Sequence, residues 1–319
     1  MKCASFFAGV GGIDLGFEQA GFEVIYANEI DKHATETFSI NHPSVIMDNR
    51  NIVDVTIEEI PDFDIMLAGF PCQAFSIAGY RKGFQDKGRG DLFFELERIF
   101  LAKKPSVIFL ENVKNLVGHD GGRTFKIIRQ SLIDAGYHVK YKVLNASEYG
   151  NIPQNRERIY IVCFKNRELE RNFEFPKAVN LTTQIADMLE DEDCIDRKYY
   201  YTNRTPFFEM LISDVRDANT LYQWRRKYVR KNKSGLCPTL TANMGTGGHN
   251  VPLLNVKGRP DTIRKLTPRE CFNFQGYPKS FILPKQSNAN LYKQAGNSVV
   301  VPVIKAIAEK IKQVISMKT

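Results

Sequence analysis

Near its start the chain reads Lys2-Cys3-Ala4-Ser5-Phe6-Phe7-Ala8-Gly9-Val10-Gly11-Gly12, a short apolar run that leads into a glycine-rich turn. The apolar run predicts a buried strand, and the residues after the turn predict a helix. Glycine lets the backbone turn tightly and bring amide groups close to a ligand. The segment therefore predicts the ligand-binding end of an α/β sheet. It lacks the strict dinucleotide fingerprint, because Asp14 occupies the place of the last glycine, and this argues against a pyrophosphate cofactor.

Short β-branched or aromatic runs alternate with amphipathic stretches through the first half of the chain. We expect strands at residues 3–7, 23–27, 64–68, 107–110, 138–144 and 159–164. Helical stripes lie between them, formed by Leu92, Phe93, Leu96, Ile99 and Phe100 and by Phe125, Ile128 and Leu132. This alternation predicts an α/β fold with a doubly wound, mostly parallel sheet covered by helices.

The length of 319 residues predicts two unequal domains, because a single core usually stops growing at about 250–300 residues. From about Asp187 to Thr262 the periodicity is lost, which is typical of a smaller domain rich in loops. A last helical stripe predicts a return to the large domain, and it consists of Ile304, Ile307, Ile311, Val314 and Ile315. We expect a large domain at 1–186 plus 297–319, a small one at 187–268, and a connecting hinge at 269–296.

Composition narrows the class of protein. Hydrophobic residues make up 43% and charged residues 25%, which is typical of folded globular proteins. The sequence has no run of about 18 apolar residues and no signal-peptide pattern, so we expect a cytoplasmic protein without a membrane segment. The 6 cysteines form no Cys-x-x-Cys pair and have no zinc-ligand spacing, so we expect neither disulfides nor a metal. The net charge of +8 includes a basic, aromatic segment at 224–231, which indicates a polyanionic partner or a solvated face.

Glu29 follows the second expected strand, about twenty residues after the glycine turn. An acidic side chain at this place accepts hydrogen bonds from both hydroxyls of a ribose. Together with the glycine turn it predicts an adenosine-type ligand without phosphates. The alternative is a charge that stabilises the N-terminus of the next helix.

Three segments bring reactive side chains to the same edge of the sheet. Gly69-Phe70-Pro71-Cys72-Gln73 places Cys72 at the carboxyl end of a parallel strand, where open α/β sheets bind ligands; a small buried hydrophobe is the alternative. Leu110-Glu111-Asn112-Val113 ends the next strand and brings a carboxylate. Gln154-Asn155-Arg156-Glu157-Arg158 offers guanidinium groups suited to a phosphate or a polarised carbonyl.

These three segments and the glycine turn Phe7-Ala8-Gly9-Val10-Gly11-Gly12 resemble motifs of the C5-cytosine DNA methyltransferase family. Two later segments resemble further motifs of that family, namely Arg264-Lys265-Leu266-Thr267-Pro268-Arg269-Glu270 and Gln294-Ala295-Gly296-Asn297-Ser298-Val299. The resemblance covers nearly the whole chain except mainly residues 180–260, and it is strongest to small bacterial restriction-modification enzymes. It implies a Rossmann-like fold and methyl transfer from S-adenosylmethionine to carbon 5 of a cytosine flipped out of duplex DNA, without a metal. The large domain would then be catalytic and cofactor-binding, and the small one would recognise the target sequence.

The resemblance also implies the catalytic roles. The thiolate of Cys72 would add to carbon 6 of the cytosine and make carbon 5 nucleophilic. Glu111 would hold ring nitrogen 3 and the exocyclic amine and supply a proton or hydrogen bond. Arg156 would hold the carbonyl of the base, and Arg158 would brace the site. The second product would be S-adenosylhomocysteine.

By the same resemblance the cofactor contacts Phe7, Gly9, Val10, Gly11, Gly12, Glu29, Ile30, Asn51, Ile52, Pro71, Leu92, Asn297 and Val299. One position departs from the family pattern. Where an acid usually accepts a hydrogen bond from the adenine amine, this chain has Asn51, whose side-chain carbonyl accepts that bond without charge. We therefore expect the same ligand.

Two segments are expected to contact DNA. Residues 73–90 contain glycines and cations typical of a lid over the base, with a long surface loop as the alternative. Residues 238–250 resemble the Thr-Leu recognition motif of the family. With the basic segment, the expected DNA contacts are Ser76, Arg81, Lys82, Arg89, Arg225, Arg226, Lys227, Thr239, Asn243, His249 and Asn250.

Two other functions stay open from the sequence. The first is the same chemistry on transfer RNA, and the second is a non-catalytic relative that only binds DNA. The basic segment favours DNA, and the presence of Cys72, Glu111 and Arg156 favours an enzyme. We expect a monomer in the bacterial cytoplasm that associates with the nucleoid through DNA and shares its site with a restriction endonuclease.

Overall fold

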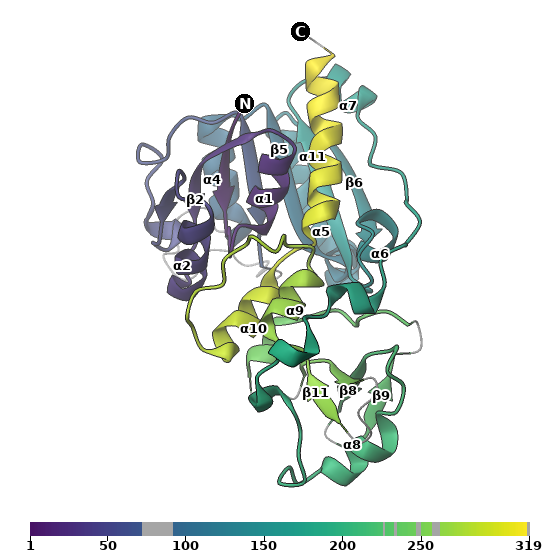
Figure 1. Cartoon of the computed structure of the whole chain (residues 1–319). Helices are drawn as coiled ribbons and strands as arrows, with labels where there is room; N and C mark the ends of the chain where they lie inside the picture. Colours follow the sequence, from purple (N-terminus) through teal and green to yellow (C-terminus); the bar gives the residue numbers. More distant parts are fainter. Residues whose placement is uncertain (72–91, 226, 233–234, 247–249, 257–261, 318–319) are drawn as a thin grey trace. The chain divides into compact units, whose positions relative to one another are not determined.

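The computed structural model describes residues 1–71, 92–225, 227–232, 235–246, 250–256 and 262–317 (Figure 1). The chain forms two compact units. Unit 1 consists of Met1–Leu144, Glu157–Lys177 and Val303–Thr319, and unit 2 of Asn145–Arg156 and Ala178–Pro302. These units reflect only how the chain packs. The catalytic role expected of the large domain and the recognition role expected of the small one stay predictions.

Unit 1 is built on a seven-stranded sheet with the order β3-β2-β1-β4-β5-β7-β6. Its strands are β1 (Lys2–Phe6), β2 (Glu23–Asn28), β3 (Ile46–Asp48), β4 (Ile65–Gly69), β5 (Val107–Val113), β6 (His138–Asn145) and β7 (Glu157–Phe164). The first five strands pair in parallel, whereas β7 runs antiparallel to β5. The predicted mostly parallel sheet is confirmed, and the short edge strand β3 is an addition to the six expected strands.

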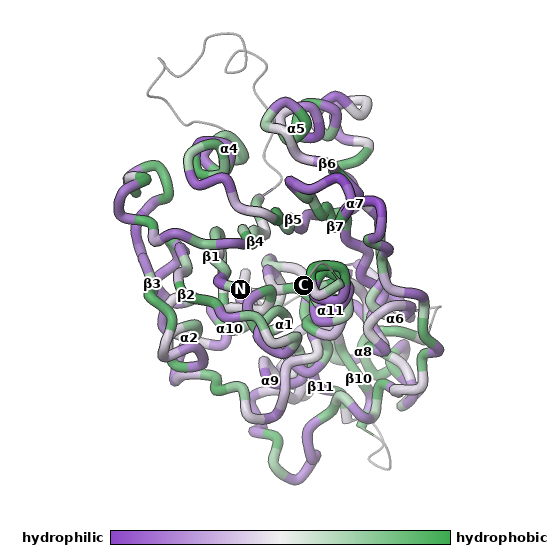
Figure 2. Tube along the Cα trace, turned by 90° about the horizontal axis from the view of Figure 1, so that it is seen from above, coloured by the Kyte–Doolittle hydropathy of each residue, from purple (hydrophilic) through white to green (hydrophobic). Residues whose placement is uncertain are grey.

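Helices cover both faces of this sheet. They are α1 (Gly12–Gln19), α2 (Lys32–Asn41), α4 (Leu92–Lys103), α5 (Arg123–Asp134), α7 (Arg167–Asn172) and α11 (Val301–Ser316), with 3-10 turns η1 (Ile52–Asp54), η3 (Lys114–Val117) and η4 (His119–Gly122). Figure 2 shows α4 and α5 on one side of the sheet and α1 and α11 on the other. No helix among the described residues is both long and apolar enough to span a membrane.

The apolar stripes predicted for α4 and α5 form the core on one face of the sheet. Phe93, Leu96 and Ile99 are fully buried, and so are Ile128 and Leu132. Each such side chain contributes roughly 1.5–3 kcal/mol relative to an exposed one. On the other face α1 and α11 approach so closely that a Cβ at Gly16 would lie 2.5 Å from Cγ2 of Ile304.

Unit 2 contains a four-stranded sheet with the order β11-β10-β8-β9, in which the pairs are antiparallel. The strands are short: β8 (Tyr222–Trp224), β9 (Val229–Lys231), β10 (Leu253–Asn255) and β11 (Ile263–Lys265). The helices are α6 (Ala146–Tyr149), α8 (Phe208–Asp214), α9 (Pro268–Asn273) and α10 (Asn288–Asn297), with 3-10 turns η5 (Ile185–Met188), η6 (Glu192–Cys194), η7 (Arg197–Tyr199) and η8 (Ala242–Gly245). A small core around Leu211, Tyr222 and Ile263 supports this sheet.

Candidate active site

The glycine-rich turn between β1 and α1 has a left-handed backbone. Phe7, Gly9 and Gly11 have φ angles of 55°, 58° and 86°. Glycine enters this region without strain, whereas other residues rarely do. The amide of Gly11 donates to the carbonyl of Ala8 at 3.0 Å and closes the turn, while Val10 and Gly12 are buried. Backbone strain at a non-glycine residue such as Phe7 occurs often at ligand sites. The contact of this turn with a cofactor stays a prediction.

Glu29, directly after β2, joins this turn. Its Oε2 accepts a hydrogen bond from the amide of Gly9 at 2.9 Å, and its Oε1 accepts one from the amide of Asp31 at 2.8 Å. The side chain of the next residue, Ile30, is 60% exposed. A fixed carboxylate beside an exposed apolar side chain offers the two kinds of contact that a nucleoside needs. The structure thus brings together Glu29 and Gly9, which the sequence predicted to share one ligand.

The segment after β3 carries two further residues predicted to contact the cofactor. Asn51 is exposed, and its side-chain oxygen accepts a hydrogen bond from the amide of Val53 at 3.3 Å, so it caps η1. A carbonyl oxygen has a second lone pair, so this cap leaves room for a hydrogen bond from an adenine amine. Ile52 is buried in the core, and Asn28 fastens the segment by donating to the carbonyl of Arg50 at 2.9 Å.

Glu111 lies on β5 opposite Gly69, the last residue of β4. A Cβ at Gly69 would lie 3.6 Å from Oε2 of Glu111, so the carboxylate sits directly beside the end of that strand. The next side chain, Asn112, is buried and donates from Nδ2 to the carbonyl of Phe70 at 2.8 Å. These contacts hold the acid against the chain that leads to Pro71. The predicted nucleophile Cys72 lies outside the described residues.

Arg158 pairs with Glu111 across β5 and β7. Its Nε lies 3.1 Å from Oε1 of Glu111, and the two side chains are only 13% and 10% exposed. The guanidinium also donates from Nη1 to the carbonyl of Glu157 at 2.9 Å. Partial burial strengthens such a pair relative to one in water. The structure therefore places one acid and one guanidinium together at the predicted catalytic edge.

Arg156 has a different environment from the one expected of a residue that holds the base. The residue is 3% exposed, and Nη1 donates to the carbonyl of Leu240 at 2.6 Å. Its Nη2 donates to the carbonyls of Gly296, at 3.2 Å, and Ser298. These contacts lie within unit 2 and tie together segments far apart in the sequence. Both Nη groups of Arg156 are thus directed at backbone carbonyls, whereas Arg158 contacts Glu111. The roles of the two arginines toward a base stay predictions.

The remaining cofactor residues belong to different parts of the chain. Leu92 is the first residue of α4 and packs partly buried against the core of unit 1, while Pro71 is exposed. Asn297 ends α10, where it is exposed, and Val299 is 5% exposed. Both belong to unit 2. Their contact with a cofactor stays a prediction.

Some of the residues predicted to bind DNA are described. Arg225 and Lys227 are exposed in the turn between β8 and β9. Thr239 donates to the carbonyl of Asn155 at 2.5 Å, and the side-chain oxygen of Asn243 accepts from Thr241 at 2.5 Å. Asn250 is half-buried. The other expected contacts lie outside the described residues, namely Ser76, Arg81, Lys82, Arg89, Arg226 and His249.

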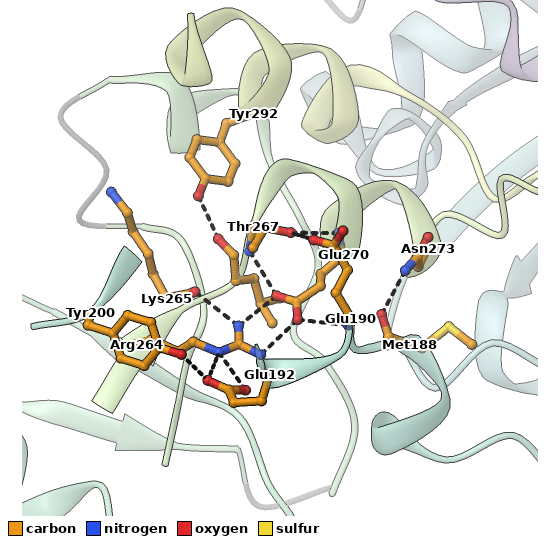
Figure 3. Close-up of polar contacts among 11 residues, drawn as sticks. Met188, Glu190, Glu192, Tyr200, Arg264, Lys265, Thr267, Glu270, Asn273 and Tyr292 are labelled. Atoms are coloured by element: carbon orange, nitrogen blue, oxygen red, sulfur yellow. Dashed lines mark hydrogen bonds and ion pairs between the residues drawn. The ribbon is translucent and has the colours of Figure 1, made fainter. Parts of the chain in front are cut away.

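Unit 2 also holds a buried ionic network that the sequence did not reveal (Figure 3). The guanidinium of Arg264 is fully buried and makes two hydrogen bonds to Glu270, both at 2.8 Å. Its Nε donates to the carboxylate of Glu192 at 3.0 and 3.1 Å. Thr267 caps α9 and donates to Glu190 at 2.5 Å. Residues that precede the small sheet are thus fastened to its last strand, β11, and to residues that follow this strand.

Gln154 also has a role that the sequence pattern does not predict. It is 0% exposed, donates to the carbonyl of Phe274 at 2.6 Å and accepts from the amide of Leu240 at 3.1 Å. Its place two residues before Arg156 was the available signal. Both side chains satisfy buried backbone groups that would otherwise be unpaired. Among the described residues no group of three or more His, Cys, Asp or Glu side chains could hold a metal ion.

Comparison with known proteins identifies the family. The model of the C-5 cytosine-specific DNA methylase family matches residues 1–313. The chain is 61% identical over 315 residues to the Type II methyltransferase M.Bsp6I of Bacillus sp. (strain RFL6), covering 98% of each chain. It is 41% identical over 331 residues to the Type II methyltransferase M.HhaI of Haemophilus parahaemolyticus, covering 100% of this chain and 96% of the relative.

Solved structures agree with this fold. The DNMT2 mutant of Spodoptera frugiperda has a TM-score of 0.75 at 21% identity and covers 98% of this chain and 99% of its own. The Dnmt2 methyltransferase of S. pombe has a TM-score of 0.74 at 19% identity and covers 100% and 99%. These likenesses show the Rossmann-like methyltransferase fold. Together with the family match, they show that the chain belongs to the C-5 cytosine-specific DNA methylases and is a DNA (cytosine-5-)methyltransferase.

Proposed function

We propose that the protein transfers a methyl group from S-adenosylmethionine to carbon 5 of a flipped cytosine, through a transient bond between Cys72 and carbon 6. The observation that carries the proposal is the pair of Glu111 and Arg158 beside Gly69, at the end of the strand that leads to Cys72. A carboxylate and a guanidinium side by side match the amine, ring nitrogen and carbonyl along one edge of cytosine.

The residues divide the reaction between them. The sulfur of Cys72 forms a bond to carbon 6, and the displaced electron pair is stabilised at ring nitrogen 3 by a proton or hydrogen bond from Glu111. The cofactor, when bound, supplies an electrophilic methyl group to the electron-rich carbon 5. A base then removes the carbon 5 proton, the ring double bond re-forms, and the thiolate leaves. We assign the carbonyl of the base to Arg158, because both Nη groups of Arg156 already donate to backbone carbonyls.

We further propose that the cofactor binds at the glycine turn. Glu29 would accept hydrogen bonds from the ribose, and its contacts to Gly9 and Asp31 already fix the carboxylate. Phe7, Ile30 and Ile52 would contact the adenine with Pro71 and Leu92, and Asn51 would accept from its amine. Asn297 and Val299 would lie near the methionine end. This arrangement would separate the cofactor turn from the acid that handles the base.

The wider context is also part of the proposal. Carbon 6 of a cytosine is inaccessible within a stacked duplex, so the base must leave the helix before Cys72 can reach it. Residues 187–268 would recognise the target sequence, and residues 73–90 would cover the extruded base. We expect a monomer that acts in the bacterial cytoplasm, is associated with the nucleoid through DNA, and shares its target with a restriction endonuclease.

The test uses the purified chain, methyl-labelled S-adenosylmethionine, and duplex DNA with 5-fluorocytosine in place of cytosine. Fluorine cannot leave carbon 5 as the proton does, so the enzyme should remain covalently bound to the DNA. Cys72→Ala should form no complex, whereas Cys194→Ala, which removes an exposed cysteine of unit 2, should form it normally. Failure of the unaltered protein to form the complex would contradict the mechanism. Transfer to transfer RNA but not to duplex DNA would instead support the RNA alternative.

A further inference from the structure

A cluster of three ionisable side chains lies beneath the glycine turn. Asp14 and Glu18 are one helical turn apart on α1, so they project from the same face of that helix. His42 directly follows α2, and its Nδ1 lies 2.9 Å from Oε2 of Glu18. Asp14 is 0% exposed and His42 is 3% exposed. The predicted chemistry assigns no task to these residues.

The imidazole of His42 touches the cofactor turn itself. A Cβ at Gly11 would lie 2.4 Å from Nε2 of His42 and 3.0 Å from Cδ2 of Phe38, so this position admits no side chain. The ring of His42 also packs against that of Phe38, with 4.5 Å between their centroids. The imidazole is therefore held between α1, α2 and the backbone of the turn.

Burial makes the charges of this cluster depend on one another. Burial raises the pKa of Asp14 to about 6. The second largest influence is the charge of His42, which lowers this pKa. Burial alone would lower the pKa of His42, but Glu18, Asp14 and the backbone of Gly11 outweigh it, so this pKa is raised above its usual 6.5. On β1, burial followed by the charge of Asp14 raises the pKa of the Cys3 thiol, which therefore stays neutral. When His42 is protonated, its charge is opposite to the charges of Asp14 and Glu18.

We propose that His42 is a positioning residue for the cofactor turn, and that its protonated imidazole joins Glu18 on α1 to the backbone at Gly11. A protonated imidazole has two N–H donors, one for each of these partners, whereas the neutral ring has only one. Loss of the proton removes one contact and leaves Asp14 without its counter-charge. The inference rests on the proposed binding of S-adenosylmethionine at this turn, and it predicts that cofactor affinity falls when His42 is deprotonated.

The experiment measures the dissociation constant of S-adenosylhomocysteine by calorimetry between pH 6 and 9. This product allows no turnover, so binding is observed alone. In the unaltered protein the dissociation constant should rise about tenfold as pH passes through the pKa of His42, because one hydrogen bond to a charged group is lost. His42→Gln should bind about tenfold more weakly at low pH and show no step. Any titration of the ligand itself is shared by every variant, so it cancels.

The variant Asp14→Asn provides a second, independent test of the inference in the same experiment. It keeps the shape of the side chain but removes a charge that raises the pKa of His42, so the step should move to lower pH. His138→Gln, at the start of β6 on the opposite edge of the sheet, is the matched control and should keep the original profile.

The inference would be overturned if the dissociation constant of His42→Gln changed with pH as it does in the unaltered protein. It would also be overturned if the change in Asp14→Asn occurred at the original pH. Asp14→Asn is the decisive test if His42→Gln does not fold. Binding with no step in the unaltered protein would overturn this inference alone. No binding at any pH would overturn the proposed cofactor site and this inference with it.

Discussion

Nε of Arg158 lies 3.1 Å from Oε1 of Glu111, and the contact crosses the antiparallel pair of β7 and β5. In that register Glu111 is opposite Tyr160 and Arg158 is opposite Val113, so the two charged residues are diagonal neighbours on one face of the sheet. Rigid strands hold both groups, which limits their movement before a substrate arrives.

Glu111→Gln should lower kcat by about 10²–10⁴-fold, because an amide keeps the shape of the carboxyl group but cannot supply a proton. The dissociation constant for S-adenosylhomocysteine should stay unchanged, since the cofactor turn is formed by other residues. Single-turnover methyl transfer and calorimetry measure the two quantities. Glu174→Gln, on the exposed surface of the same unit, serves as the control. An active Glu111→Gln variant would remove the acid from the mechanism.

The two arginines should respond differently to lysine. Arg158→Lys loses the planar donor group beside Glu111 and should lower kcat about 10–100-fold with little change in stability. Arg156→Lys replaces two separate Nη groups by a single nitrogen, which cannot lie close to the carbonyls of Leu240, Gly296 and Ser298 at once, and it should lower the free energy of unfolding by about 2–5 kcal/mol. Urea titrations and initial rates on both variants test this division. The opposite pattern would restore the base-holding role to Arg156.

Arg264→Met should lower the free energy of unfolding by about 3–5 kcal/mol, because it leaves the carboxylate of Glu270 buried without a counter-charge. Adding Glu270→Leu should recover part of that loss, since removing both charges removes the unpaired one. Arg123→Met breaks an exposed pair with Asp120 and should leave the urea midpoint where it was. Equal midpoints for Arg264→Met and the unaltered protein would show that the network does not stabilise unit 2.

Asp14 should make the folded protein less stable as pH rises from about 4 to 6. Its pKa is about 6 in the folded protein against an ordinary 3.8, so the folded state keeps a proton that the unfolded state has released. The bound proton therefore stabilises the folded state fully below pH 3.8, and this stabilisation is lost as pH rises through 6. The stabilisation amounts to at most about 3 kcal/mol. The urea midpoint of Asp14→Asn should not fall between pH 4 and 6. At pH 7 it should be higher than the midpoint of the unaltered protein.

DNA binding should weaken steeply with salt, because lysine and arginine contacts to phosphates release counterions. The log–log slope should be about −0.9 for each phosphate contacted. Lys227→Gln, in the exposed turn after β8, should make the slope less steep by about 0.9, whereas Lys126→Gln on α5 should not change it. Fluorescence anisotropy with a duplex at several salt concentrations gives the slope, and identical slopes for the two variants would exclude Lys227 as a phosphate contact.

Most of unit 1 could be predicted because its signals are local. The stripe of Phe93, Leu96 and Ile99 has helical spacing, and all three side chains are buried as expected. The three-residue strand β3 was missed, since a strand this short leaves too few residues for a period. In unit 2 each strand of the small sheet has three residues and therefore carries an equally weak signal.

The site was predicted where its parts are local, or are linked by strand order. Glu29 and Gly9 met as expected, because parallel strands bring their carboxyl ends to one edge. The environment of Arg156 could not be predicted, since the carbonyls that it contacts lie 84 and 140 or more residues away along the chain. Likewise, neither Asp14 nor His42 carries a local signal that each influences the charge of the other near Gly11.

The buried contacts of Arg264 with Glu192 and Glu270 affect which residues can diverge in sequence. Both ends of the segment that holds the small sheet are fixed at one place, so an insertion or deletion between them costs little in loop-closure entropy. Residues 195–263 can therefore diverge in length and composition while the anchoring side chains keep the ends in register. Sequence divergence should be fastest inside that interval and slowest at the anchoring residues Glu192, Arg264 and Glu270.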